Sequence, residues 1–265
     1  MRCPTAEVVG VGINGVIGEF PEAVVGSRLL RSATDTANPA MAREEPGMRT
    51  LVASTFLTLD GVMQAPGGPE EDPTSGFRWG GWSTGYWDDR MQEVMGEAMS
   101  RPFDLLLGRK TYDIFAAHWP SVTDDPGAAA LNTTTKYVVS TTLTQPGWDN
   151  TVVIDGDVVA AVHRLKDSPG PELQVHGSWQ LLQTLLGAAL VDEFRLWIFP
   201  VVVGPGKRLF GSGVIPARLR LLDVTTSTTG VLLTTYRAAG GVVTGSFALD
   251  EPTEAELRRR RSLDG

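Results

Sequence analysis

The stretch that decides the fold is LLLGRKTYDIF, residues 105–115. An apolar β-rich run ends on Gly108, two cations follow, and apolar residues then return at a different spacing. A strand that ends on glycine lets the backbone approach a ligand closely, and a helix that starts at Thr111 points its free N–H groups at the same place. The junction that Gly108 and Thr111 form with Arg109 and Lys110 therefore predicts an anion site. An ordinary turn with a threonine cap is the alternative that these residues leave open.

Two other expected strands end on small or polar residues in a similar way. The run ELQVH ends on Gly177, and Ser178 is of the residue type that caps helices. The run YVVS ends on Ser140, and Thr141 follows it. In a parallel sheet these ends meet at one edge, where α/β proteins bind ligands. The sequence has no GxGxxG or Walker motif, so we expect neither an ordinary Rossmann site nor a P-loop.

Short β-rich runs alternate with helical ones through the rest of the chain. The expected strands are 51–57, 103–108, 137–140, 151–154, 172–177, 193–203, 218–225, 231–237 and 241–248, and the expected helices are 88–100, the segment from Thr111, 156–166 and 178–190. This alternation predicts a mostly parallel sheet covered on both faces, and the closing strands predict an antiparallel edge. The expected fold class is a three-layer α/β/α domain with a mixed sheet.

The organisation of the chain follows from composition. Residues 1–47 are expected to be a disordered or weakly ordered extension, because 31–49 is rich in Ala, Pro, Ser, Thr and charge and has no periodicity. A translation start at Met48 is an open alternative. Residues 48–249 form the expected domain, and 250–265 form a charged tail that is either a short helix or a frayed end.

Charge and cysteine content exclude several classes of protein. The net charge of −8 and the pI near 5.0 argue against binding to nucleic acid or to anionic membranes. Cys3 is the single cysteine, so an intrachain disulfide and a multi-thiolate metal site are both excluded, and a reducing cytoplasm is the expected location. With three scattered histidines besides, we expect no metal. We interpret His118, His163 and His176 as structural or exposed.

The segment MQAPGGPEEDPTSGFRWGGWSTGYW, residues 63–87, is long, and it is dense in glycine, proline and aromatic residues. Loops of this length in compact domains are either functional lids or disordered. The four aromatic residues Trp79, Trp82, Tyr86 and Trp87 favour a lid, because disordered segments are poor in aromatics.

Five segments, in order, resemble the dihydrofolate reductase fold, and within it the reductase domain of the riboflavin-biosynthesis protein RibD and its stand-alone relatives. The segments are FLTLDGVM (56–63), LLLGRKTYDIF (105–115), KYVVSTTL (136–143), HGSWQLLQTLL (176–186) and LVDEFRLWIFPVVVGPGKRLF (190–210). The resemblance covers about residues 49–237, and Thr58 stands where serine is commoner in the family.

The resemblance implies an NADPH-dependent reductase. The 108–111 junction would then hold the cofactor phosphates, Ser140 and Thr141 would lie by the adenosine end with its 2′-phosphate, and Gly177 with Ser178 would hold the pyrophosphate. The nicotinamide would lie near Asp60 and the segment 200–203, which includes Val201 and Val202.

Few protein side chains have to take part in the reaction, because hydride comes from the cofactor. Asp60 is the best candidate for substrate orientation or a proton relay, and a plain Asp-Gly turn residue is its alternative. The other candidate substrate-binding residues are Trp82, Tyr112, Phe115, Trp119 and Pro200. For the three on the expected helix after the phosphate turn, a place in the core is the competing interpretation.

The implied activity is hydride transfer to a small heterocyclic, carbonyl or imine acceptor, similar to 5-amino-6-(5-phosphoribosylamino)uracil reductase or dihydrofolate reductase. The chain departs from the bifunctional family members because it lacks the deaminase half with its zinc ligands, which argues against a role in riboflavin biosynthesis. Two other classes stay open. One is a nucleotide-binding protein without turnover, and the other is an interaction module in which the lid tryptophans form a homodimer surface.

Overall fold

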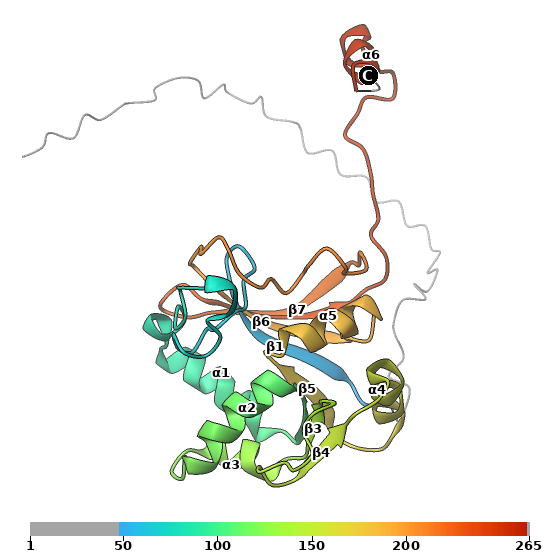
Figure 1. Cartoon of the computed structure of the whole chain (residues 1–265). Coiled ribbons are helices and arrows are strands. Elements are labelled where there is room, and N and C mark those ends of the chain that lie inside the picture. The colour runs from blue at the N-terminus through green and yellow to red at the C-terminus, as the bar shows by residue number, and fades with distance from the viewer. Residues whose placement is uncertain (1–47, 264–265) are drawn as a thin grey trace, which may run out of the picture. The chain divides into compact units, whose positions relative to one another are not determined.

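The structure, a computed structural model, describes residues 48–263, and the expected extension over residues 1–47 lies outside them. The described residues form one eight-stranded sheet in the order β4, β3, β2, β5, β1, β6, β8, β7 (Figure 1). Neighbouring strands from β4 to β6 are parallel, whereas β8 is antiparallel to both β6 and β7, which confirms the expected mixed sheet. The strands are β1 (Leu51–Thr58), β2 (Phe103–Gly108), β3 (Lys136–Val139), β4 (Thr151–Ile154), β5 (Glu172–His176), β6 (Glu193–Phe199), β7 (Leu219–Thr226) and β8 (Leu232–Ala238).

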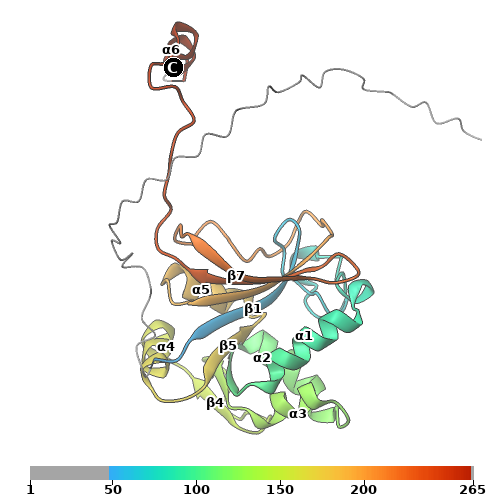
Figure 2. The same ribbon diagram turned by 180° about the vertical axis from the view of Figure 1, so that it is seen from behind.

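Helices cover both faces of this sheet, which gives the three layers that the sequence predicts (Figures 1 and 2). Leu106 of β2 packs with Leu182 of the helix after β5, whereas Leu105 and Leu107 pack with Leu131 on the opposite face. Because side chains alternate along a strand, the apolar run of β2 is buried on both sides. The helices on the α1 side are α1 (Asp89–Ser100), α2 (Arg109–His118) and α3 (Pro126–Thr133), and those on the α5 side are α4 (Val158–Asp167) and α5 (Trp179–Gly187).

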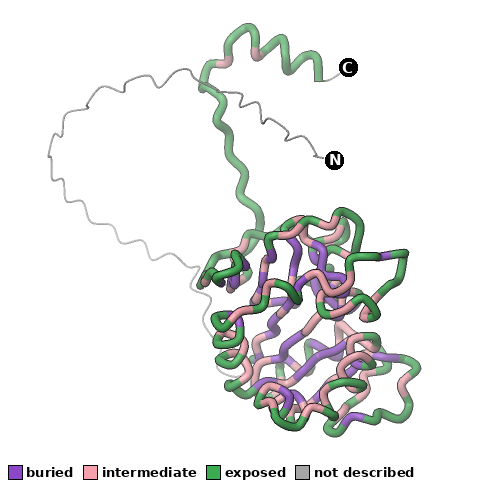
Figure 3. The backbone as a smooth tube through the Cα atoms, turned by 90° about the vertical axis from the view of Figure 1, so that its left-hand side faces the viewer, coloured by how far each residue is buried: buried purple, intermediate pink, exposed green. Residues whose placement is uncertain are grey.

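The core follows the strands. Buried residues run along the strands in the middle of the domain, and exposed residues gather on the loops (Figure 3). Arg49, just before β1, is also buried, and its Nε donates to the carbonyl of Pro171 at 2.6 Å while its guanidinium pairs with Asp104. These contacts tie the start of β1 to β2 and to the segment before β5.

Two expectations about strands are wrong. Residues 241–248 form no strand, because β8 already lies between β6 and β7 and because adjacent Val242 and Val243, with Gly245 beyond them, break the alternation that a half-buried strand needs. The strand that begins at Glu193 ends at Phe199 rather than at residue 203, since Pro200 has no N–H to donate to a ladder.

Helix α3 is absent from the sequence expectations, although its start signal is present. Asp125 accepts the N–H of Ala128 at 2.7 Å, and Pro126 occupies the first turn, as is common at helix starts. In the tail, α6 (Glu254–Arg261) is the short helix of the two alternatives, and Thr253 caps it. Among residues 48–263, no helix has the length and apolar character needed to cross a bilayer.

Candidate functional site

The turns after β2 and β5 lie side by side, because these strands are parallel neighbours. The N–H of Gly108 donates to Oγ of Ser178 at 3.0 Å, and the N–H of Ser178 donates to Oγ1 of Thr111 at 3.0 Å. The Ser178 hydroxyl in turn donates to the carbonyl of His176 at 3.0 Å. The two predicted phosphate turns are therefore locked to each other by side-chain to backbone hydrogen bonds.

The second turn has an unusual backbone. Gly177 has φ of +54° and Ser178 has φ of +51°, both in the left-handed region. Glycine enters that region freely, whereas a residue with a side chain pays about 1 kcal/mol or more. Such strain concentrates at ligand-binding turns. With this backbone conformation, the Ser178 hydroxyl contacts the β2 turn instead of capping its own helix.

The helices that begin at these turns lack the caps that the other helices have. Helices α1, α3 and α4 begin with Asp88, Asp125 and Asp157, whose carboxylates accept first-turn N–H groups. Neither α2 nor α5 has a side-chain cap, because Gly108 has no side chain and Ser178 faces the other turn. Two positive helix ends with free N–H groups thus meet at one place, which is a suitable site for phosphate.

Two cations stand at the start of α2. The Nε of Arg109 donates to both carboxylate oxygens of Asp113, at 2.8 and 2.9 Å, and its NH1 donates to Oγ1 of Thr142 at 3.3 Å. Arg109 therefore bridges α2 and the loop after β3. Lys110 is exposed. The positive charge of Arg109 is partly offset by Asp113 before any ligand arrives.

The loop after β3 brings the third predicted strand end to the same edge. Ser140 is buried, and its Oγ accepts the N–H groups of Thr142 and Leu143 at 3.2 and 3.0 Å. Its hydroxyl therefore shapes the turn. Thr141 is exposed at the tip of the turn, next to the Arg109 contact.

The Asp60 carboxylate is fully engaged within the chain. It accepts hydrogen bonds from the Thr58 hydroxyl at 2.6 Å, from the N–H of Gly204 at 2.9 Å and from the N–H of Val203 at 3.3 Å, and it pairs with Arg208 at 3.3 Å. Burial raises the pKa of Asp60, but these hydrogen bonds outweigh burial and hold its pKa below the usual value. The structure places Asp60 as the residue that fastens the segment after β6 to the end of β1.

The segment after β6 follows the carboxyl end of that strand. The carbonyl of Val201 accepts the N–H of Leu59 at 2.8 Å, and the side chain of Val201 packs into the aromatic core. Val202 is 66% exposed, and Pro200 is exposed as well. The segment therefore offers two apolar side chains to a ligand at this end of the sheet.

The aromatic lid segment is ordered around Phe199. Trp82 and Tyr86 meet the ring of Phe199 edge-on, with centroid distances of 5.3 and 5.8 Å. The indole N–H of Trp82 donates to the carbonyl of Gln64 at 2.8 Å. Trp79 is 56% exposed. Trp82 is thus a packing residue of the lid, whereas Trp79 and Trp87 are its exposed aromatic residues.

The three aromatic candidates of α2 and its end have different surroundings. Tyr112 is 3% exposed, and its hydroxyl accepts the N–H of Trp148 at 3.2 Å, so it belongs to the core. The ring of Phe115 lies 6.1 Å from that of Trp119 and 6.4 Å from that of His176. Of the three, Phe115 is the one in contact with the carboxyl end of β5.

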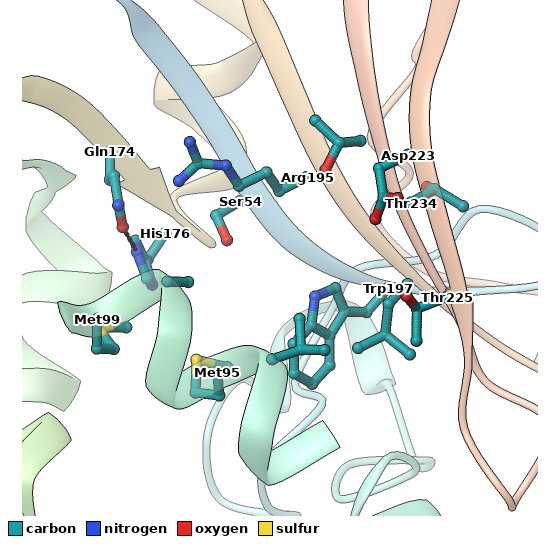
Figure 4. Close-up of a pocket in the computed structure, with 14 residues that line it drawn as sticks. Ser54, Met95, Met99, Gln174, His176, Arg195, Trp197, Asp223, Thr225 and Thr234 are labelled. Atoms are coloured by element: carbon teal, nitrogen blue, oxygen red, sulfur yellow. Dashed lines mark hydrogen bonds between the residues drawn. The ribbon is translucent and has the colours of Figure 1, made fainter. Parts of the chain in front are cut away.

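A hollow of about 70 Å³ lies between α1 and the sheet (Figure 4). None of the expected substrate-binding residues lines it. The sequence signal that could have found it is the alternation in ELQVH, which places three polar side chains on one face of a buried strand. Its lining includes Ser54 of β1, Met95 and Met99 of α1, Gln174 and His176 of β5, and Arg195 and Trp197 of β6.

A balanced ion network borders the hollow. NH1 and NH2 of Arg195 donate to the two carboxylate oxygens of Glu172 at 2.7 and 2.8 Å, and its Nε donates to Glu193 at 3.1 Å. Arg237 pairs with Glu193 at 3.2 Å. Burial raises the pKa of Glu172, but the hydrogen bonds from Arg195 and Gln174 outweigh it, so the pKa lies below the usual value.

His176 stands at the end of this network. Its Nε2 lies 2.8 Å from Oε1 of Gln174. Burial, together with the positive charge of Arg195, lowers the pKa of His176 to about 4, so the ring is neutral at pH 7. In the described part of the chain, no three His, Cys, Asp or Glu side chains gather into a metal site.

A family model and a protein of known sequence match this chain. The family model described as the RibD C-terminal domain matches residues 49–233. The uncharacterized protein YyaP of Bacillus subtilis (strain 168) is 28% identical over 202 residues, which cover 72% of this chain and 96% of that protein.

Two solved structures are similar to this chain. One is a Shewanella sp. PV-4 protein described under riboflavin biosynthesis, with 21% identity, a TM-score of 0.52, and coverage of 71% of this chain and 98% of that one. The other is a pyrimidine reductase-like protein from Corynebacterium diphtheriae, with 15% identity, a TM-score of 0.47, and coverage of 72% and 92%. The first supports the same fold, in line with the resemblance seen in the sequence.

Proposed function

Because the chain belongs to the RibD C-terminal domain family through residues 49–233, we propose that it is an NADPH-dependent reductase acting on a small heterocyclic, carbonyl or imine acceptor. The observation that carries this proposal is the meeting of two uncapped helix N-termini, those of α2 and α5, across the Gly108 to Ser178 hydrogen bond. Two adjacent anion sites of this kind match a ligand with several phosphates.

The donor set fits NADPH. The first-turn N–H groups of Lys110 and Thr111 in α2, and of Trp179 and Gln180 in α5, would hold the pyrophosphate. Arg109, which already reaches the loop after β3, would hold the 2′-phosphate with bidentate hydrogen bonds. When bound, the cofactor supplies the hydride. The protein has to position it and keep water away.

Other residues would orient the nicotinamide and the acceptor. Asp60 fixes the segment after β6, so that the exposed side chains of Pro200 and Val202 would form an apolar wall beside the nicotinamide ring. The lid, closed by the packing of Trp82 on Phe199, would exclude water from the same end of the sheet. The acceptor would enter from the α1 side, where the hollow reaches the carboxyl end of β5.

Binding and turnover test the proposal separately. Tryptophan fluorescence of the full chain is titrated with NADPH and NADH, and NADPH oxidation is then followed at 340 nm with a panel of pteridine, aminopyrimidine and carbonyl acceptors. We expect saturable binding that favours NADPH, and oxidation with at least one acceptor class. Binding without any oxidation would support the nucleotide-binding alternative, and no binding to either nucleotide would overturn the proposal.

A matched pair of variants makes the binding test specific. Arg109→Ala should weaken NADPH binding by about 10-fold or more, the worth of a charge-assisted hydrogen bond. Arg90→Ala is the control, because Arg90 is also a helix arginine paired with a nearby carboxylate, and its side chain is 42% exposed compared with 38% for Arg109. Arg90→Ala should leave the affinity unchanged.

A further inference from the structure

The hollow beside α1 is lined by His176, and one ring nitrogen of His176 has no hydrogen-bond partner among residues 48–263. Every fully buried side-chain nitrogen and oxygen in residues 48–263 has a hydrogen-bond partner. Nδ1 of His176 has no such partner within those residues, so it is not fully buried, and His176 lines the hollow. Figure 4 shows the ring beside Gln174, to which a dashed line joins it.

The hydrogen-bond chain behind His176 sets its tautomer. Glu172 is held ionised by Arg195, so its carboxylate can only accept. The group of Gln174 that lies 2.6 Å from Glu172 must therefore be its NH2, because the opposite orientation would press two oxygens together. That orientation leaves Oε1 of Gln174 facing Nε2 of His176, which must carry the hydrogen. Nδ1 is then a lone-pair acceptor.

The arginine that lines the hollow is paired with carboxylates before a ligand enters. Arg195 faces Glu172 and Glu193, and Glu193 also pairs with Arg237. Asp223, from β7, lines the hollow as well. Among residues 48–263, Arg195 is the only cation that lines the hollow, and its two carboxylate partners already hold it, so the site favours an uncharged group over a phosphate.

The hollow would have to widen to admit a ring. A volume of about 70 Å³ is small, since each water in the liquid occupies about 30 Å³. Met95 and Met99 form the wall on the α1 side, and methionine side chains repack easily. Trp197, stacked on Phe56 at 5.1 Å, forms a rigid apolar wall at one end.

We propose that His176 is a specificity-determining residue whose Nδ1 accepts a hydrogen bond from an N–H or O–H group of an uncharged acceptor, and that Gln174 is the positioning residue that keeps this lone pair available. This inference rests on the proposed reductase function. It deepens that function by choosing uncharged, donor-bearing acceptors and by placing any phosphorylated group outside the hollow.

The tautomer is tested first, without any ligand. The full chain has three histidines, so ¹⁵N-labelled histidine side chains give few signals, and the spectrum of His176→Gln identifies those of His176. We expect the hydrogen on Nε2 and an unprotonated Nδ1. In Gln174→Leu the oxygen that accepts the hydrogen on Nε2 is lost, and a mixture of tautomers should replace the single form. A hydrogen on Nδ1 in the intact chain, or an unchanged tautomer in Gln174→Leu, would overturn the proposal.

Ligand recognition is tested next, with NADP⁺ present, using 2-pyridone as an uncharged ring with one N–H donor. N-methyl-2-pyridone, which has no donor, and inorganic phosphate are the matched comparisons. The Nδ1 signal should shift with 2-pyridone alone, and His176→Phe should weaken 2-pyridone binding about 3- to 10-fold, as for loss of one hydrogen bond between neutral groups. His118→Gln, which alters an exposed histidine, is the control and should change nothing.

The outcomes separate this inference from the reductase proposal. Equal shifts with both pyridones, a shift with phosphate, or no shift with any of the three would overturn the assignment of His176. NADP⁺ binding is measured on the same samples. If NADP⁺ fails to bind, the reductase proposal fails. If NADP⁺ binds but 2-pyridone does not shift the Nδ1 signal, only the proposed role of His176 is overturned.

Discussion

The backbone N–H of Gly108 donates to the side-chain oxygen of Ser178 at 3.0 Å, although 70 residues separate them in the sequence. This bond joins the turns at the ends of β2 and β5, and it diverts the Ser178 hydroxyl from its own helix. The start of α5 therefore has no side-chain cap, and the start of α2 has none because Gly108 lacks a side chain. The proposed cofactor site depends on this one arrangement.

Substitutions of Ser178 separate its hydroxyl from its backbone conformation. Ser178→Ala leaves the Gly108 N–H without its acceptor and should cost about 1 to 3 kcal/mol of stability. Ser178→Gly loses the same bond but relieves the positive φ, so it should be less destabilised than Ser178→Ala by about 1 kcal/mol. Urea unfolding of both variants measures the difference. An equal loss in the two would show that φ of +51° carries no cost here.

Asp113 should restrain Arg109 before the cofactor binds. In Asp113→Asn the guanidinium is released, and NADPH affinity should rise about 2- to 5-fold, because an exposed ion pair is worth less than about 1 kcal/mol. Fluorescence titration at low and high salt checks this, since the gain should shrink as salt screens the charges. In an Arg109→Ala background the gain should disappear. Persistence of the gain there would mean that Asp113 acts directly on the ligand.

His176 should make the protein sensitive to acid. Its pKa is lowered to about 4 in the folded chain from an ordinary 6.5, so between these values the unfolded chain binds more protons. Stability from this group is present above pH 6.5 and is lost as the pH falls toward 4, by about 1 to 3 kcal/mol in total. Urea unfolding at pH 7 and 4.5 should show a smaller acid loss in His176→Gln. Parallel losses would contradict this origin.

Lys136 should make the stability of the protein depend on pH in the alkaline range, as His176 does in the acid range. Its side chain is fully buried, its Nζ donates to the carbonyls of Asn132 and Asp149 at 2.7 and 3.1 Å, and burial lowers its pKa from 10.5 to about 8. Between these values the unfolded chain binds more protons, so stability from this group rises with pH by about 1 to 3 kcal/mol. Unfolding of Lys136→Met between pH 7.5 and 10 should lack that rise. The same rise in the variant would assign it to other groups.

The sheet and the positions of the turns at its carboxyl edge could be predicted because their signals are local. Glycine at positions 108 and 177 and the polar end at Ser140 mark the carboxyl ends of strands, and parallel strands bring such ends together. Helix α3 carried a readable signal in Asp125 and Pro126 that the sequence expectations left out. The strand expected at 241–248 failed because a sheet has room only at its edges, which composition cannot show.

The hollow beside α1 could not be found in the same way. Its network joins Glu172 to Arg195, 23 residues apart, and to Glu193 on a strand that is not adjacent to β5 in the sheet. Each of these residues, taken alone, is an ordinary charged residue in a strand. Only the register of β5, β1 and β6 places them on one face, and only the α1 packing closes that face over His176.

The most direct test of the central claim follows the backbone amides of the ¹⁵N-labelled full chain during a titration with NADPH. The account predicts that the N–H signals of Lys110, Thr111, Trp179 and Gln180 shift together and saturate with a single dissociation constant, as two helix ends holding one ligand must. Saturable shifts confined to other parts of the chain, or shifts in α2 without α5, would contradict it.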